Sequence, residues 1–142
     1  MSTLVCYLTQ ITRCGSQYRN RRTEPLGIRA RQSSLLMEIC ATPGISQDTL
    51  AKRVFLNKSV VARLLANLEE QGLVARPTCQ KDRRVIRLHP TEKALDILPK
   101  LQKIDGDWEQ FLTSNMTAEE IATLEAMLCR LQTRAAQWED VE

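Results

Sequence analysis

The middle of this 142-residue chain holds two short helical patterns in close succession, each introduced by a residue that favours a helix start. Ser46 precedes the first, which has an apolar face of Leu50, Ala51 and Val54. Asn57 precedes the second, whose apolar positions are Val60, Val61, Leu64, Leu65 and Leu68. Ser and Asn side chains accept hydrogen bonds from the free N–H groups of a first helical turn. We therefore predict consecutive helices over residues 47–54 and 57–71, joined by a tight turn.

Two short β-like runs follow the second helix. They cover residues 73–76 and 84–89, and a polar, basic loop over 77–83 separates them. Gly72 stands where a helix end favours a left-handed residue, a conformation that glycine adopts without steric cost. The pattern predicts a hairpin with a long tip. Together with the two helices, it makes a helix-turn-helix followed by a β-wing.

Longer amphipathic helices are expected on both sides of this middle segment. Apolar spacing predicts helices over residues 3–19 and 28–41, with a charged connector over 20–27 between them. Thr91 introduces a further helix over 92–112. Pro99 lies inside that helix, so we expect a kink or a break there.

The last predicted helix carries an apolar stripe that a small domain has difficulty burying. It begins with the capping box formed by Thr117 and Glu120. Its stripe comprises Ile121, Leu124, Met127, Leu128, Leu131, Ala135 and Trp138. The expected fold is mainly α with a small β-wing: a winged helix-turn-helix flanked by N- and C-terminal helices. A second copy of the chain would supply the missing apolar surface.

Composition argues against several protein classes. No run of about 18 apolar residues is present, so no membrane span is expected, and we see no secretory signal at the start of the sequence. Five cysteines without a Cys-x-x-Cys pair argue against a disulfide scaffold, and with the single His89 they offer no zinc site. We recognise no phosphate-binding glycine loop and no nucleophile with a histidine base, so we expect neither an enzyme nor a cofactor. A reducing, cytoplasmic compartment fits this pattern.

The net charge of +3 is distributed unevenly. Residues 13–31 contain six arginines against one glutamate, a net +5. Residues 52–87 contain nine basic and three acidic residues, a net +6, whereas residues 105–142 contain nine acids and two arginines, a net −7. A basic middle beside an acidic end is typical of a domain that binds a polyanion. Ordinary solvated helix faces are the alternative explanation.

The polar side of the second helix carries residue types that suit the major groove of DNA. Opposite its apolar stripe lie Asn57, Lys58, Ser59, Ala62, Arg63 and Asn67. Donors and small residues near a helix start allow close approach to bases and phosphates. The hairpin adds Asp82, Arg83, Arg84 and Arg87, and an arginine at a wing tip suits the minor groove. A solvated helix face and a local salt bridge in the loop remain the alternatives.

Residues 45–92 resemble the winged helix-turn-helix of the MarR family of bacterial transcription regulators. The matching parts are Leu50-Ala51, Lys58-Ser59-Val60-Val61 with Arg63, Leu68-Glu69 followed by Gly72-Leu73-Val74, Asp82-Arg83-Arg84, and Thr91-Glu92. The flanking helices come in the family's order, so the resemblance extends over nearly the whole chain. Pro90 departs from the family's pattern, and we expect it only to sharpen the corner between the strand and the next helix.

The resemblance implies a homodimer that binds a pseudo-palindromic operator in double-stranded DNA, usually as a repressor. It also implies an N-terminal dimerisation helix and connector over 1–27, a DNA-binding domain over 28–90 and C-terminal dimerisation helices over 91–142. Carried over by residue, Arg84 would be the minor-groove arginine and Asp82 its orienting partner. The start of the helix over 57–71 would read the major groove. A winged helix that binds protein instead of DNA is the competing interpretation.

Two modes of control, also implied by the resemblance, remain open. A small aromatic effector would enter a cleft for which the candidates are Tyr7, Tyr18, Arg19 and Trp108. These residues suit a core or an interface equally well.

Oxidation would act on Cys6, Cys14 or Cys79. Cys6 and Cys14 lie about 12 Å apart along one helix, too far for a bridge within it. Aligned without gaps, the family's organic-peroxide sensors place their reactive cysteine at Val5 instead. Cys79 lies among basic residues in the wing loop, where its modification would disturb contact with DNA.

Overall fold

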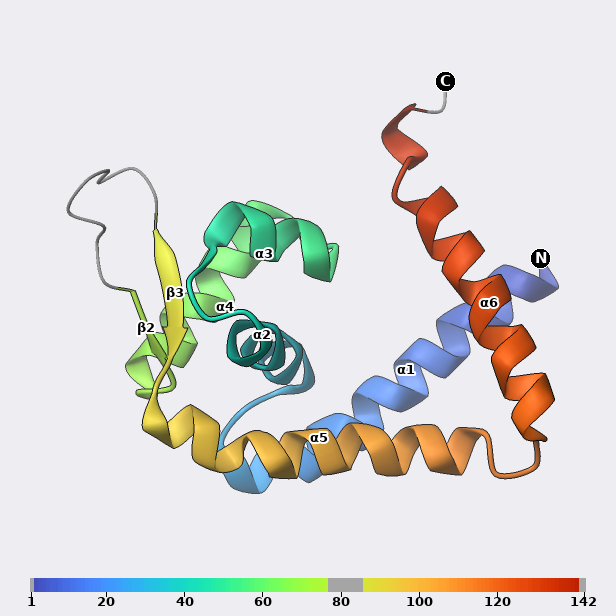
Figure 1. The fold of residues 1–142 in the computed structure, drawn as a ribbon, viewed down its shortest axis with the longest axis horizontal. Helices are drawn as coiled ribbons and strands as arrows, with labels where there is room; N and C mark the ends of the chain where they lie inside the picture. Colours follow the sequence, from blue (N-terminus) through green and yellow to red (C-terminus); the bar gives the residue numbers. More distant parts are fainter. Residues whose placement is uncertain (1, 77–85, 141–142) are drawn as a thin grey trace. The chain divides into compact units, whose positions relative to one another are not determined.

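The computed structural model describes residues 2–76 and 86–140. The described residues are mostly helical, at 76%, with a small three-stranded antiparallel sheet, so the predicted fold class is confirmed. The elements are α1 (Thr3–Thr23), a 3₁₀ turn (Glu24–Leu26), α2 (Ala30–Ala41), β1 (Ile45–Ser46), α3 (Gln47–Val54), α4 (Lys58–Glu70), β2 (Val74–Ala75), β3 (Arg87–Pro90), α5 (Glu92–Leu112), α6 (Ala118–Ala135) and a 3₁₀ turn (Trp138–Asp140). Figure 1 shows their order along the chain.

Both predicted caps of the helix-turn-helix are present. The Ser46 hydroxyl accepts a hydrogen bond from the Thr49 N–H at 3.1 Å, and the side-chain Oδ1 of Asn57 accepts one from the Val60 N–H at 2.9 Å. Each cap satisfies a donor that the first helical turn leaves free. Helices α3 and α4 therefore begin where the sequence predicts, and they gather with α2 around one core (Figure 1).

The sheet has one strand more than the sequence predicted. Strand β3 lies in the middle and pairs with β1 through Ile45 and Leu88, and with β2 through Val74 and Pro90. Strand β1 is only two residues long, too short to show an alternating pattern. The predicted strands over 73–76 and 84–89 appear as Val74–Ala75 and Arg87–Pro90, and residues 77–85 lie outside the described residues.

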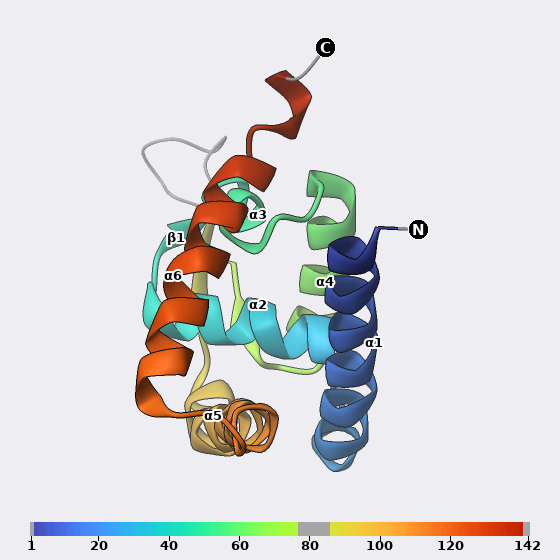
Figure 2. The same cartoon turned by 90° about the vertical axis from the view of Figure 1, so that its right-hand side faces the viewer.

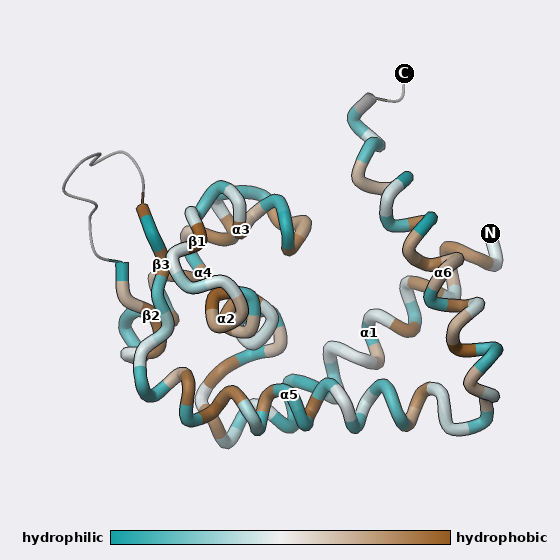
Figure 3. Tube along the Cα trace, in the orientation of Figure 1, coloured by the Kyte–Doolittle hydropathy of each residue, from teal (hydrophilic) through white to brown (hydrophobic). Residues whose placement is uncertain are grey.

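The core lies where α2, α3 and α4 meet the sheet. Its fully buried side chains are Leu35, Leu36, Ile39, Leu50, Val61, Leu65, Leu68 and Leu88, each with 0% exposure. Those on α3 and α4 are apolar positions that the sequence predicts to face inward, and α2 and the central strand β3 supply the others. Burying a leucine contributes roughly 1.5–3 kcal/mol to folding. The apolar residues of α2 stand out in Figure 3.

Helix α1 is longer than predicted and packs on α5. It reaches Thr23, where the sequence suggested a charged connector. Arg21 and Arg22 lie in its last turn and complement the helix dipole there. Gly15 is buried because the Trp108 ring covers it, and a Cβ at Gly15 would come within 3.1 Å of that ring's nitrogen. Figure 2 shows α1 passing the start of α2.

Helix α5 runs without interruption from Glu92 to Leu112, so the break considered at Pro99 does not occur. Proline removes one backbone hydrogen bond of the helix. Buried side chains on both sides of Pro99, Ala94 and Leu101, anchor the helix in the core at 0% exposure. Packing of these side chains in the core therefore keeps α5 continuous on both sides of Pro99.

The chain divides into two compact units, Met1–Trp108 and Glu109–Glu142. In the second unit, Thr117 and Glu120 form the predicted capping box at the start of α6. No residue of α6 is buried, and Met127, Leu128 and Leu131 are 40–49% exposed. The predicted apolar stripe of α6 is thus uncovered. No helix among the described residues is long and apolar enough to cross a membrane.

Candidate nucleic-acid interface

Helix α4 separates its apolar and polar residues onto opposite sides. Val61, Leu64, Leu65 and Leu68 are buried in the core. The residues predicted to face DNA lie on the other side, where Ala62 is half-buried and Asn57, Lys58, Ser59, Arg63 and Asn67 are exposed. The core contacts of α4 therefore fix which side chains it offers to a partner.

The first turn of α4 is organised by its own polar residues. The side-chain Oδ1 of Asn57 accepts hydrogen bonds from the Val60 N–H and from the Ser59 hydroxyl, the latter at 2.8 Å. Asn57 therefore offers its amide N–H groups to a partner, while Ser59 keeps its lone pairs as acceptors. This arrangement holds both side chains in place at the end of the helix that would enter a groove.

Lys58 makes an ion pair that a phosphate could replace. Its Nζ lies 3.4 Å from the Asp48 Oδ1, and the two side chains are 72% and 70% exposed. An exposed pair of this kind contributes less than about 1 kcal/mol. Lys58 is therefore free to turn from Asp48 to a backbone phosphate with little loss.

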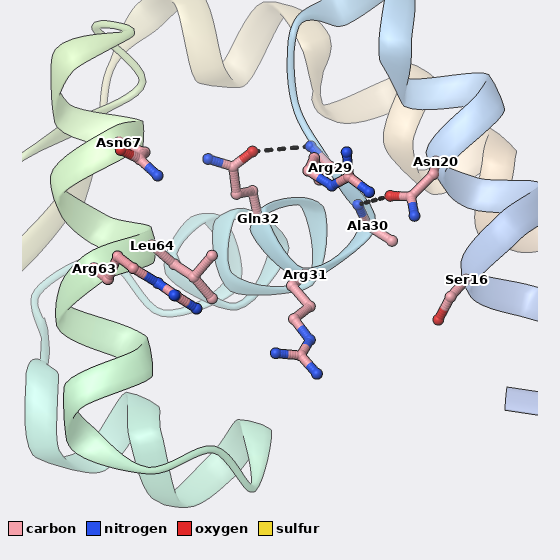
Figure 4. Close-up of a pocket in the computed structure, with 9 residues that line it drawn as sticks. All are labelled: Ser16, Asn20, Arg29, Ala30, Arg31, Gln32, Arg63, Leu64 and Asn67. Carbon is pink, nitrogen blue, oxygen red and sulfur yellow. Dashed lines mark hydrogen bonds between the residues drawn. The ribbon is translucent and has the colours of Figure 1, made fainter. Parts of the chain in front are cut away.

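Arg63 and Asn67 line a cavity of about 620 Å³. The sequence did not predict this cavity. Its wall also includes Ser16 and Asn20 from α1, and residues 29–32 at the start of α2 (Figure 4). Two arginines of that start, Arg29 and Arg31, were absent from the predicted site. The signal that could have found them is the net charge of +5 over residues 13–31.

The described part of the wing contributes Arg87, which is exposed on β3. Its Nη1 donates a hydrogen bond to the Gly44 carbonyl at 3.2 Å, which ties the side chain to the segment before β1. The other predicted wing residues, Asp82, Arg83 and Arg84, lie outside the described residues, as does Cys79.

Three of the four effector candidates come together between α1 and α5. Tyr18 stacks on Trp108 with ring centroids 5.0 Å apart, and the Arg22 guanidinium lies 4.9 Å above the Tyr18 ring. Burial raises the pKa of the nearby Asp105 carboxyl, and the positive charge of Arg19 partly offsets this. Tyr7 does not join them, because it lies about three turns earlier, near the start of α1, and is 60% exposed.

The described cysteines are all free thiols: Cys6, Cys14, Cys40 and Cys129. Cys14 is exposed and Cys6 is half-buried, so both are open to modification. Burial raises the pKa of the Cys40 thiol, which lowers its thiolate fraction and its reactivity. No cluster of three or more potential metal ligands occurs among residues 2–76 and 86–140.

A helix-turn-helix on a shared core, with a small antiparallel sheet beside it and a polar outer face on α4, defines a winged-helix protein. Residues 26–85 match the model of the MarR family. Over its whole length the chain is 27% identical to YybA of Bacillus subtilis, an uncharacterized HTH-type transcriptional regulator, and covers 95% of it.

Solved structures share this fold. The transcriptional regulator SlyA superimposes with a TM-score of 0.95 at 24% identity, over 99% of this chain and 100% of that one. A mutant of MarR from E. coli, complexed with operator DNA, gives a TM-score of 0.81 at 28% identity, over 90% of this chain and 92% of that one. The chain is therefore similar to MarR-type transcriptional regulators, with the family's model matching residues 26–85.

Proposed function

We propose that this protein is a homodimeric repressor that binds a pseudo-palindromic DNA operator through α4 and the wing. The observation that carries the proposal is the exposed polar face of α4, held outward by the buried stripe of Val61, Leu64, Leu65 and Leu68. The E. coli relative complexed with operator DNA supports it.

In this proposal the start of α4 enters the major groove. Arg63 binds a guanine edge or a phosphate with two hydrogen bonds, and Ser59 and Asn67 contact bases or the backbone. Ala62 leaves room for close approach, and Lys58 binds phosphate in place of Asp48. On the wing, Arg84 inserts into the minor groove, Asp82 orients it, and Arg83 and Arg87 add positive charge.

The dimer follows from apolar side chains that the single chain leaves uncovered. On α1, Leu4, Val5 and Tyr7 are at least 53% exposed, and no residue of the stripe on α6 is buried. A second copy would cover both, with residues 1–27 and 91–142 as dimerisation segments around the DNA-binding domain 28–90. Two-fold symmetry then requires a two-fold symmetric operator.

Release from DNA has two candidate triggers. A small aromatic ligand would act near Tyr18, Arg19 and Trp108, with Tyr7 as an outlying candidate. Oxidation would act at Cys6 or Cys14 on α1, or at Cys79 in the wing loop. We place the protein in the cytoplasm with the DNA it regulates.

The salt dependence of DNA binding tests the proposal. A dimer that contacts several phosphates loses affinity steeply as salt is added. The logarithm of its binding constant falls linearly with the logarithm of the salt concentration, with a slope of about −0.9 per phosphate contact. Arg84→Ala should weaken operator binding by roughly 1–3 kcal/mol while circular dichroism stays unchanged. Unchanged affinity would refute the wing contact. Absence of DNA binding at low salt would favour the protein-binding alternative.

A further inference from the structure

We propose that Arg29 and Arg31, at the start of α2, act with Arg63 of α4 as a clamp for one phosphate of the bound DNA backbone. The inference rests on the proposed DNA binding and extends the contact surface to a segment outside the recognition helix and the wing. The chemical group recognised is a phosphodiester anion, which arginine binds with paired hydrogen bonds.

The geometry places the three arginines around one cavity. Arg29 and Arg31 come from the start of α2 and Arg63 from the middle of α4, and all three line the 620 Å³ space. Figure 4 shows Arg31 and Arg63 reaching from their separate helices toward the same opening. The three side chains are exposed, so an anion in solution has access to them.

The charge of this cavity has no compensation within the described chain. No acidic residue lines it, and no ion pair of Arg29, Arg31 or Arg63 occurs within residues 2–76 and 86–140. Other basic residues of the same unit do have partners, such as Arg53 with Glu38, and Arg76 with Glu69. A cleft lined by charges of one sign attracts and concentrates counter-ions, so the cavity favours an anion.

The backbone that carries Arg29 and Arg31 is held firmly. The Ala30 N–H donates to the Asn20 Oδ1 at 2.8 Å, and the Arg29 N–H donates to the Gln32 Oε1 at 2.9 Å. Ala30 and Gln32 are both 6% exposed. The backbone at the start of α2 is therefore ordered before DNA binds, and the exposed side chains of Arg29 and Arg31 extend from it.

The position beside α4 identifies the anion as part of DNA. Arg63 and Asn67 belong both to this cavity and to the polar face that enters the major groove in the proposed complex. A phosphate next to that groove therefore meets Arg63 from one side and α2 from the other. Most residues of the wall are polar or basic, and Ala30 and Leu64 are its apolar residues.

The test compares Arg29→Ala, Arg31→Ala and the double variant with Arg130→Ala, which removes an exposed arginine from α6. Fluorescence anisotropy would measure affinity for operator and for random DNA across a salt series. The clamp predicts a loss of roughly tenfold for both DNAs in the double variant, since charge-assisted hydrogen bonds are the strong ones. It also predicts that the slope of log affinity against log salt concentration becomes shallower by about 0.9 for each protomer, because each protomer loses one phosphate contact. Arg31→Lys should keep the dependence of affinity on salt, because the charge remains, and should lose part of the affinity, because lysine cannot form the paired hydrogen bonds.

Each contrary result overturns the clamp. A double variant that behaves like Arg130→Ala, with unchanged melting temperature, shows that no phosphate lies there. A loss of affinity that depends on the identity of one base pair shows that the arginines contact a base instead of a phosphate. If the double variant keeps DNA affinity but loses inhibition of DNA binding by inorganic phosphate, the cavity takes a free anion instead. If the parent protein binds no DNA, the proposed function itself fails, which is distinct from failure of the clamp alone.

Discussion

Helices α4 and α6 have similar apolar stripes, but they bury them differently. Val61, Leu65 and Leu68 of α4 are completely buried by α2, α3 and the sheet, whereas no residue of α6 is buried. The helices that cover α4 are its neighbours in sequence, so the helix-turn-helix forms a core from one chain. An apolar stripe on a helix therefore predicts that the stripe is buried, but it does not indicate whether the surface that buries it belongs to the same chain or to a second copy.

Truncating a core residue of α4 should have the largest effect on stability. Leu65→Ala removes a side chain with 0% exposure and leaves a cavity, so it should cost about 2–5 kcal/mol of unfolding free energy. Urea denaturation followed by circular dichroism measures this loss. A cost below about 1 kcal/mol would show that the core of α4 is not closed within one chain.

A charge in the stripe of α6 should act on assembly instead. Leu128→Asp, at a side chain that is 40% exposed in the single chain, would place a carboxylate in the proposed dimer interface, where its desolvation is costly. We expect monomers at micromolar concentration in analytical ultracentrifugation. Ala126→Asp, on the opposite side of α6, is the matched control and should remain dimeric. A stable dimer of Leu128→Asp would refute the interface.

The cap of α6 gives a smaller effect that also depends on pH. Thr117→Ala removes the capping hydroxyl, and should cost about 1 kcal/mol. Hydrogen bonds from the Thr117 backbone and side chain lower the pKa of Glu120. The folded pKa lies below the unfolded one, so this stabilisation is present at neutral pH and is lost as pH falls through the folded pKa.

Circular dichroism of the parent protein and Glu120→Gln between neutral pH and about pH 3 checks this linkage. The variant cannot titrate at residue 120, so its melting temperature should change less over the acidic part of the range. An identical pH profile for the two proteins would contradict the role of Glu120 in the cap.

Much of the fold was predictable because its signals are local. Ser46, Asn57 and Thr117 are caps that act within one turn, and the stripe of α4 repeats at helical spacing. Strand β1 carries no such signal, because two residues become a strand only through pairing with β3. The break considered at Pro99 is absent because Ala94 and Leu101 are buried by distant parts of the chain.

The residues of the candidate site also divide into those that local sequence signals predict and those that depend on contacts between distant parts of the chain. The outward residues of α4 follow from its inward stripe, so Lys58 and Arg63 could be placed on the correct side from sequence. Arg29 and Arg31 could not, because their closeness to Arg63 depends on how α2 crosses α4. The cluster of Tyr18 and Trp108 likewise requires the contact between α1 and α5, which spans most of the first unit.

The most direct test of the central claim is selection of binding sites from a random pool of double-stranded DNA with the purified protein, at several salt concentrations and with and without a thiol oxidant. The account predicts enrichment of a pseudo-palindrome with half-sites about one helical turn apart. Loss of binding on oxidation, reversed by reductant, would select the cysteine trigger, and binding unaffected by oxidant would select the ligand. Failure to enrich any sequence at any salt concentration would contradict a sequence-specific DNA-binding dimer.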